Sequence, residues 1–198
     1  MTGYPRARVE AVLTQRSIHA TRLFKRHHRD PIGIVPSPSR FCDGSSFAVL
    51  YGATDFDTAF LEVVVRDRFV RKPDRRVPFS ELQTRRWVTF SSPAKELNLI
   101  NLTFDRTIKL GAPTDAAKAR SHSAGRALAK SIYADHPDVD GFLYESRLTG
   151  MECFAIFDRA VAKLRVWEIG EVTTHSLLPS VLKMHDIALV RAHPSLTS

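Results

Sequence analysis

The stretch FAVLYGATDFDTAFLEVVVRD, from Phe47 to Asp67, predicts a buried strand that leads directly into a helix. Its first seven residues, which end at Ala53, are apolar, aromatic or glycine and are bounded by turn-forming residues, as in a strand that is covered on both faces. Thr54 or Asp55 can then cap a helix, where acidic residues in the first turn complement the positive end of the helix dipole. This unit requires a sheet on which the helix packs.

One residue of the predicted helix does not fit its apolar surroundings. Phe56, Phe60, Val63 and Val64 follow the spacing of a stripe that faces a core. Glu62 lies at the edge of that stripe, and a carboxylate among apolar side chains is costly unless a partner compensates its charge. Two interpretations follow. Glu62 lies on the solvated face of the helix and has no special role, or it lines a cleft in which its charge acts on a ligand.

The rest of the chain mixes strands and helices without regular alternation. Strands are predicted for RRWVTFSS, LNLINLT, GFLYES, ECFAIFD and KLRVWEIGEV, and helices for residues 115–136, weakened at Gly125, and 177–183. Residues 30–46 are rich in Pro, Gly and Ser and predict a long loop, which carries Arg40. This mixture predicts one α+β domain over residues 1–198, with one sheet or two small packed sheets. We expect a core over about residues 20–175, with the N-terminal ~15 residues and the C-terminal segment peripheral.

Composition limits the function classes. The 198 residues carry a net charge of +8, which favours anionic partners such as nucleic acid, phosphorylated metabolites or an acidic protein. No apolar window resembles a membrane span or a signal peptide, so we expect a cytoplasmic protein that does not bind membranes. Cys42 and Cys153 fit neither a disulfide framework nor a zinc spacing, and no histidine pair has metal-ligand spacing; we expect reduced cysteines and no metal. The glycine motifs of Rossmann and P-loop nucleotide sites are missing.

Several motifs occur in an order that resembles the RES domain, the toxin half of bacterial Xre–RES toxin–antitoxin pairs. They are ATRLFKR, PSRF, VLYGA, DTAFLEV and GFLYESR, and the resemblance runs from about Arg22 to Asp158. It implies an ADP-ribosyltransferase-like fold, with a mixed, mainly antiparallel sheet flanked by helices. The residues that match the family's site are Arg22, Arg40, Tyr51, Glu62 and a serine, for which we prefer Ser146 and keep Ser121. The family's usual Gly-Arg-Trp is Ser39-Arg40-Phe41 in this chain.

The resemblance also implies a reaction. RES domains resemble ADP-ribosyltransferases, which makes NAD+ the expected substrate rather than a permanently bound cofactor. Glu62 would stabilise the positive charge that develops on the ribose as nicotinamide leaves, by hydrolysis, phosphorolysis or ADP-ribosyl transfer. Arg22 and Arg40 would bind the pyrophosphate, and Tyr51 would stack on the nicotinamide ring. Ser146 or Ser121 would orient the ribose or the nicotinamide amide by hydrogen bonding.

The implied partner is an Xre-like helix-turn-helix antitoxin that blocks the cleft, and the chain would meet nucleic acid only through it. A basic RNA-binding or RNA-cleaving module is the competing interpretation, because of the net charge and because aromatic residues lie beside arginines in RRW and RLF. A third interpretation is an inactive interaction domain of the same fold.

Overall fold

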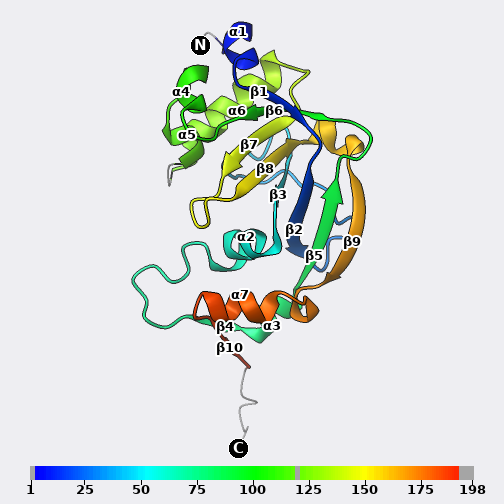
Figure 1. Ribbon diagram of the computed structural model, residues 1–198, viewed down its shortest axis with the longest axis vertical. Coiled ribbons are helices and arrows are strands. Elements are labelled where there is room, and N and C mark those ends of the chain that lie inside the picture. The colour runs from blue at the N-terminus through cyan, green and yellow to red at the C-terminus, as the bar shows by residue number, and fades with distance from the viewer. Residues whose placement is uncertain (1–2, 119–120, 192–198) are drawn as a thin grey trace, which may run out of the picture.

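Eight of the strands described in the computed structural model form one mixed sheet in the order β1-β6-β7-β8-β3-β2-β5-β9 (Figure 1). The structure describes residues 3–118 and 121–191. Strands β6 and β7 run parallel, and the other neighbouring pairs are antiparallel, which confirms the α+β fold with a mainly antiparallel sheet. The strands of this sheet are β1 Leu13–Arg16, β2 His19–Lys25, β3 Val49–Ala53, β5 Arg85–Ser91, β6 Leu97–Asn101, β7 Gly141–Glu145, β8 Glu152–Phe157 and β9 Arg165–Glu171.

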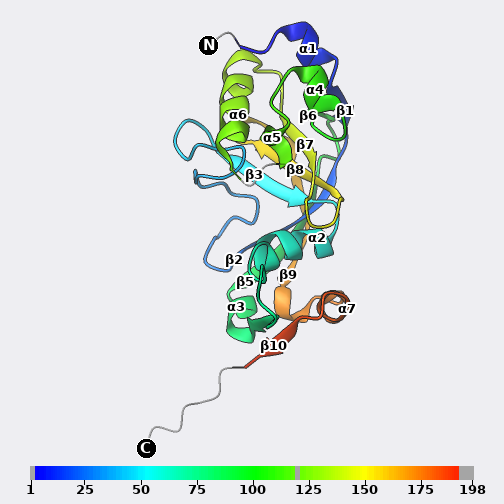
Figure 2. The ribbon, with the colours of Figure 1, turned by 90° about the vertical axis from the view of Figure 1, so that its left-hand side faces the viewer.

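The helices gather at the two ends of the molecule. Figures 1 and 2 show α1, α4, α5 and α6 at the end near the N-terminus, whereas α3, α7 and the small parallel pair of β4 and β10 lie at the opposite end. Helix α2 lies between them, next to the main sheet. The bounds are α1 Arg6–Glu10, α2 Phe56–Phe60, α3 Phe79–Gln83, α4 Arg106–Leu110, α5 Asp115–Lys118, α6 Ser123–Asp135, α7 Leu178–Met184, the π-helix η1 Leu61–Val65, the 3₁₀ helices η2 Asp158–Lys163 and η3 Val172–Thr174, β4 Arg76–Pro78 and β10 Ala188–Val190.

Each end has its own apolar core. Around α6, fully buried side chains such as Ile132 and Phe142 pack between helix and sheet, and α2, α3 and α7 close a second core that includes Phe60. The N-terminal segment, expected to be peripheral, belongs to the first core: Val9 and Val12 are completely buried. The reason is that β1 adds an edge strand beside β6 and α1 packs near α4, and both cover apolar surface that would otherwise face water.

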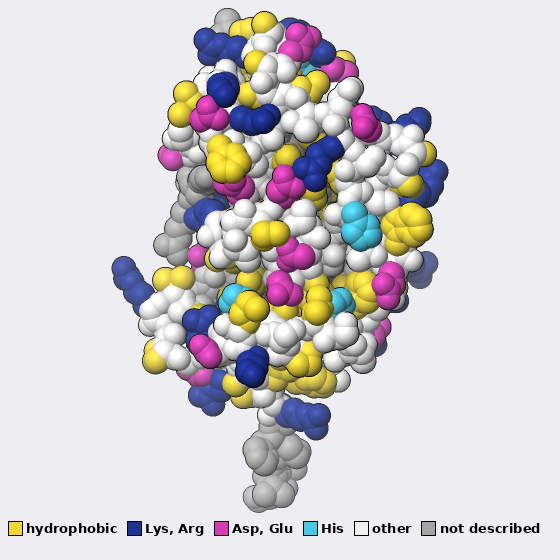
Figure 3. All heavy atoms as spheres, in the orientation of Figure 1, with side chains coloured by type: hydrophobic (Ala, Val, Ile, Leu, Met, Phe, Trp, Pro, Cys, Tyr) yellow, Lys and Arg dark blue, Asp and Glu magenta, His cyan; other side chains and the backbone are white. Residues whose placement is uncertain are grey.

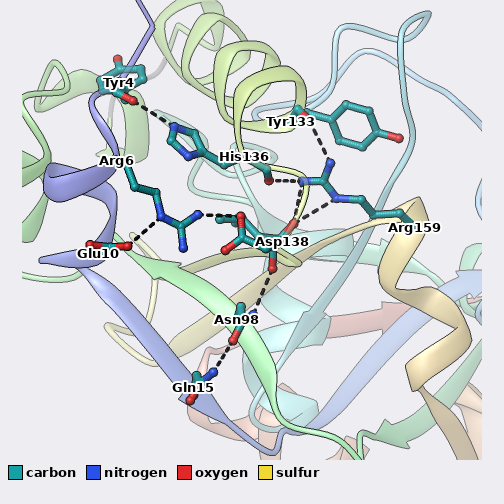
Figure 4. A network of polar contacts seen from close by, with 10 residues as sticks. Tyr4, Arg6, Glu10, Gln15, Asn98, Tyr133, His136, Asp138 and Arg159 are labelled. Atoms are coloured by element: carbon teal, nitrogen blue, oxygen red, sulfur yellow. Dashed lines mark hydrogen bonds and ion pairs between the residues drawn. The ribbon is translucent and has the colours of Figure 1, made fainter.

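Polar contacts fix the N-terminal segment and the end of α6 (Figure 4). The Arg6 guanidinium contacts a carboxylate oxygen of Asp138 at 2.7 Å. The Arg159 guanidinium donates to the main-chain oxygens of Tyr133 and His136, both at 2.8 Å. These oxygens lie at the carboxyl end of α6, where carbonyl groups have no partner within the helix. Arg159 therefore caps the carboxyl end of α6 and fixes the position of the helix over the sheet.

The single helix predicted over residues 115–136 is wrong, because the segment forms two helices, α5 and α6. A Cβ added to Gly125 would lie 2.7 Å from the main-chain oxygen of Ala116 and 2.6 Å from that of Arg40. Residues nine positions apart in one helix are separated by about 13 Å, so α6 folds back beside α5. Gly125 permits this close approach, and the loop around Arg40 is held against α6 as a result.

Candidate functional site

The candidate site lies where strands β2 and β3 separate. Within the described residues, β2 and β3 share one register pair, Thr21 with Ala53, whereas β2 pairs with β5 along its whole length. Arg22 on β2 and Tyr51 on β3 both line the cavity formed at this separation. The sheet itself therefore creates the cleft, and the predicted loop of residues 30–46, which has neither helix nor strand, covers part of it.

The cleft has two adjoining parts. The apolar lobe, of about 240 Å³, is lined by Arg22 together with apolar residues that include Ile34, Val49 and Ala59. The basic lobe, of about 270 Å³, is lined by residues that include Arg40, Arg66, His122 and Arg147. Together they fall within the volume of about 300–1,000 Å³ that is usual for small-molecule sites. The residues that line both lobes are Ser39, Tyr51, Glu62, Val63 and Tyr144.

Glu62 lies at this junction and is held by Ser146. The Ser146 hydroxyl donates to Glu62 Oε1 at 2.6 Å, and Ser146 itself is 3% exposed. The same Ser146 oxygen accepts the main-chain N–H groups of Leu148 at 3.1 Å and Thr149 at 3.4 Å. With those two donors on its oxygen, the hydroxyl directs its own hydrogen to the carboxylate, and such bonds to charged acceptors are short and strong. The partially buried carboxylate thus has a fixed orientation in the cleft.

A change of helix type explains how Glu62 reaches the cleft. Asp55 caps α2, since its Oδ1 accepts the Thr58 N–H at 2.6 Å. From Leu61 the helix widens into the π-helix η1, and this shifts the buried face by one position. The prediction that Val63 faces the core is wrong for that reason: Val63 is 38% exposed and lines the cleft, while Leu61 takes the buried position.

Tyr51 ties the covering loop to the sheet. Its hydroxyl oxygen accepts the main-chain N–H of Phe41 at 2.9 Å and lies 2.9 Å from the Ser39 hydroxyl. Burial raises the pKa of Tyr51 to about 12, so the hydroxyl stays neutral. Phe41 is completely buried and stacks on Phe142 with ring centroids 4.8 Å apart. Arg40, between the two anchored residues, is thereby positioned over the basic lobe.

Arg22 and Ser121 lie in different surroundings. Arg22 lines the apolar lobe, where its guanidinium donates to the main-chain oxygen of Gly33 at 3.3 Å and burial lowers its pKa to about 10. Ser121 is exposed, its hydroxyl lies 3.0 Å from that of Ser123, and it is not among the residues that line either lobe. The structure therefore brings together Arg22, Arg40, Tyr51, Glu62 and Ser146, and it places Ser121 outside the group.

The sequence analysis did not single out four lining residues: Tyr144, Arg66, His122 and Arg147. A signal existed for Tyr144, because it is two positions before Ser146 and side chains two apart in an extended chain share a face. Burial raises the pKa of Tyr144 well above its usual value, so it is a neutral wall of the cleft. The other three come from separate loops and helix ends, and no local pattern connects them.

The two cysteines are buried, carry free thiols and line the apolar lobe. Burial raises the pKa of Cys153 to about 12, so this thiol remains protonated. Within residues 3–118 and 121–191, no group of three or more His, Cys, Asp or Glu side chains is arranged to hold a metal ion. No helix in the described part of the chain has the length and apolar character needed to cross a membrane.

Comparison with known proteins matches the chain to a family model, to a named relative and to a solved structure. A family model described as "RES domain" matches residues 15–176. A protein of Sinorhizobium fredii named "Probable toxin y4kH" is 39% identical over 74 residues, which are 37% of this chain and 58% of the length of that relative. Among solved structures, a chain of the M. tuberculosis MbcT–MbcA toxin–antitoxin complex superposes with a TM-score of 0.66 at 16% identity, covering 90% of this chain and 94% of that chain.

Proposed function

Because the chain belongs to the RES domain family, we propose that it is the toxin of a toxin–antitoxin pair and acts by cleaving the bond between nicotinamide and ribose in NAD+. The names of the matched proteins, a probable toxin and a toxin–antitoxin complex, support the biological role. The geometry of the cleft supports the chemistry. The observation that carries the proposal is the Glu62 carboxylate, held by Ser146 at the junction of an apolar and a basic lobe.

The proposed chemical step requires a negative charge near the ribose. When the nicotinamide–ribose bond breaks, nicotinamide leaves with the bonding electron pair as a neutral molecule, and the ribose carries oxocarbenium-like positive charge. A carboxylate beside the ribose interacts more strongly with that charge than with the uncharged sugar of the ground state, so it lowers the barrier. Ser146 donates to Oε1 of Glu62, and in this proposal the other carboxylate oxygen faces the ribose and its hydroxyl groups.

The two lobes suit the two groups that the ribose joins, the nicotinamide base and the phosphates. The apolar lobe, with Ile34, Val49 and neutral tyrosine rings, accepts a flat aromatic base. The basic lobe accepts phosphate groups, because guanidinium groups form charge-assisted hydrogen bonds with them. Glu62, between the lobes, then faces the sugar that joins base and phosphate. In this arrangement Tyr51 acts at the base-binding wall and holds the loop that carries Arg40.

The structure supports different roles for the two candidate serines. Ser146 orients Glu62 directly, whereas the sequence analysis expected it to contact the substrate. Ser121 contacts the neighbouring Ser123 at the edge of α6 and takes no part in the proposed step.

Water, phosphate or a protein side chain can each complete the reaction by attacking the ribosyl cation. The products differ: ADP-ribose, a phosphorylated ADP-ribose or an ADP-ribosylated protein. Mass spectrometry of a reaction with NAD+ in phosphate buffer, with and without cell extract, identifies which product forms.

A toxin that consumes NAD+ must be held inactive by its partner. We expect an Xre-like helix-turn-helix antitoxin whose acidic segment enters the basic lobe, where opposite charges complement each other. Nucleic acid would then bind the antitoxin rather than this chain. We expect the two proteins to co-purify and the complex to release no nicotinamide. Raised salt should restore nicotinamide release.

The proposal is tested by incubating the purified chain with NAD+ and measuring nicotinamide release. Release supports the proposal. Intact NAD+ together with salt-dependent RNA binding favours the RNA module instead, and intact NAD+ without RNA binding favours the inactive interaction domain. On the face of the molecule shown in Figure 3, Lys and Arg side chains are dispersed among acidic and apolar ones, so this face offers no continuous basic stripe for RNA.

A further inference from the structure

The basic lobe combines cationic side chains from separate parts of the chain. Arg40 comes from the covering loop, Arg66 from the end of η1 and Arg147 from the β7–β8 connection. Two carboxylates, Glu62 and Glu145, also line the lobe. Burial, and next the charge of Arg147, lower the pKa of Arg40, so the positive charges lie close enough to repel one another. An anion that enters the lobe relieves this repulsion.

Arg66, at the end of η1, has an unfavourable backbone conformation. Its φ of 35° and ψ of −114° lie outside the regions that side-chain-bearing residues normally adopt. Its N–H donates to the Leu61 oxygen at 2.7 Å, which closes the π-turn that also orients Glu62. Such strain costs about 1–3 kcal/mol and occurs preferentially at functional sites. The same turn therefore fixes the position of the carboxylate and that of the arginine.

The Arg66 guanidinium contacts His122, the N-cap residue of α6. Arg66 Nη2 lies 3.1 Å from His122 Nε2. A guanidinium only donates, so Nε2 accepts and the imidazole is neutral. Burial first, and then the charges of Arg40, Arg66, Arg126 and Arg147, lower the pKa of His122. The contact with Arg66 thus requires a neutral imidazole, and both burial and the surrounding arginine charges favour that form of His122.

We propose that the basic lobe is a proton-coupled binding site for the pyrophosphate of the dinucleotide, in which Arg66 and His122 exchange their mutual hydrogen bond for hydrogen bonds to the anion. The identity of the ligand rests on the proposed function. The bound pyrophosphate offsets the arginine charges, His122 takes up one proton from solvent, and both side chains then donate to phosphate oxygens. The family resemblance implied that Arg22 binds the pyrophosphate, but Arg22 lines the apolar lobe and donates to the main-chain oxygen of Gly33.

The test measures binding of ADP-ribose to the full chain by calorimetry at several pH values and in two buffers with different ionisation enthalpies. ADP-ribose lacks nicotinamide, and its pyrophosphate does not titrate near neutral pH. We expect uptake of up to about one proton per ADP-ribose, with affinity that increases as the pH falls from about 8 to about 6. Arg66→Gln should weaken binding roughly tenfold to a hundredfold. His122→Gln, whose amide oxygen still accepts from Arg66, should keep the affinity at about pH 8 but take up no proton.

Arg71→Gln is the matched control, because it removes an exposed arginine of the same segment that is not among the residues lining either lobe. Unchanged affinity in Arg66→Gln, or the same proton uptake in His122→Gln as in the parent, would overturn the inference while leaving NAD+ cleavage untouched. Sulfate, which does not titrate in this range, is the second probe. If the parent chain binds sulfate and Arg66→Gln does not, the anion site is supported even when ADP-ribose does not bind. In that outcome the anion site stands and the proposed substrate is wrong.

Discussion

Removing the Ser146 hydroxyl should reduce the catalytic rate without weakening substrate binding. In Ser146→Ala, Glu62 loses the 2.6 Å hydrogen bond that fixes its carboxylate. A hydrogen bond to a charged group contributes about 1.5–3 kcal/mol. If that contribution is fully expressed in the transition state, kcat for nicotinamide release should fall roughly tenfold to a hundredfold, because about 1.4 kcal/mol corresponds to a factor of ten. KM should change little, since Ser146 is proposed to act on Glu62 and not on the phosphates.

Steady-state release of nicotinamide from NAD+ is the assay, with thermal unfolding measured in parallel. The matched control is Thr149→Ala, in the same β7–β8 connection as Ser146. It removes a hydroxyl that lies 3.0 Å from that of Thr58 on α2 and that accepts the Met151 N–H at 3.2 Å, and it leaves the hydrogen bond between Ser146 and Glu62 in place. The control should retain most of the parent kcat. An equal loss of kcat in both variants, or none in Ser146→Ala, would refute the reasoning.

Three further predictions concern the loop around Arg40. Gly125→Ala should lower both thermal stability and NAD+ affinity, because the new Cβ would lie 2.6 Å from the Arg40 main-chain oxygen. Phe41→Ala should destabilise the fold by about 3–5 kcal/mol in denaturant unfolding, since Phe41 is completely buried against Phe142. Burial raises the pKa of Tyr51 to about 12, so its contribution to stability is complete below about pH 10 and is lost as the pH rises toward 12. The melting temperature should therefore fall less steeply above about pH 10 in Tyr51→Phe than in the parent.

Local patterns predicted the central strand–helix unit. Strand β3 and a helix cap at Thr54 or Asp55 follow from residues adjacent in sequence, and the structure contains the strand and a cap at Asp55. The same reasoning failed at Val63, because the apolar stripe assumes a constant helical period and η1 widens the helix at Leu61. Nothing in the apolar spacing marks a π-turn, whose stabilisation comes from the contacts it makes in the folded protein.

The site depends on contacts between residues far apart in sequence. Ser146 is 84 positions from Glu62, and Arg66 is 56 positions from His122. Periodicity describes one element at a time, so it cannot bring such pairs together. The family resemblance supplied Glu62 and Ser146 as site residues, but only the structure shows that one orients the other. The arginines of the basic lobe carry no motif in the sequence and depend on the folding of the sheet and of α6.

The most direct test compares Glu62→Gln with the parent chain in two measurements: kcat/KM for nicotinamide release and the dissociation constant for ADP-ribose. Glutamine keeps the shape of the side chain and an oxygen that can accept from Ser146, but it carries no charge. The account predicts a loss of kcat/KM of about 10²–10³-fold without a loss of ADP-ribose affinity, because the charge stabilises the ribosyl cation, which forms only during the reaction. A Glu62→Gln variant that releases nicotinamide at the parent rate would contradict it.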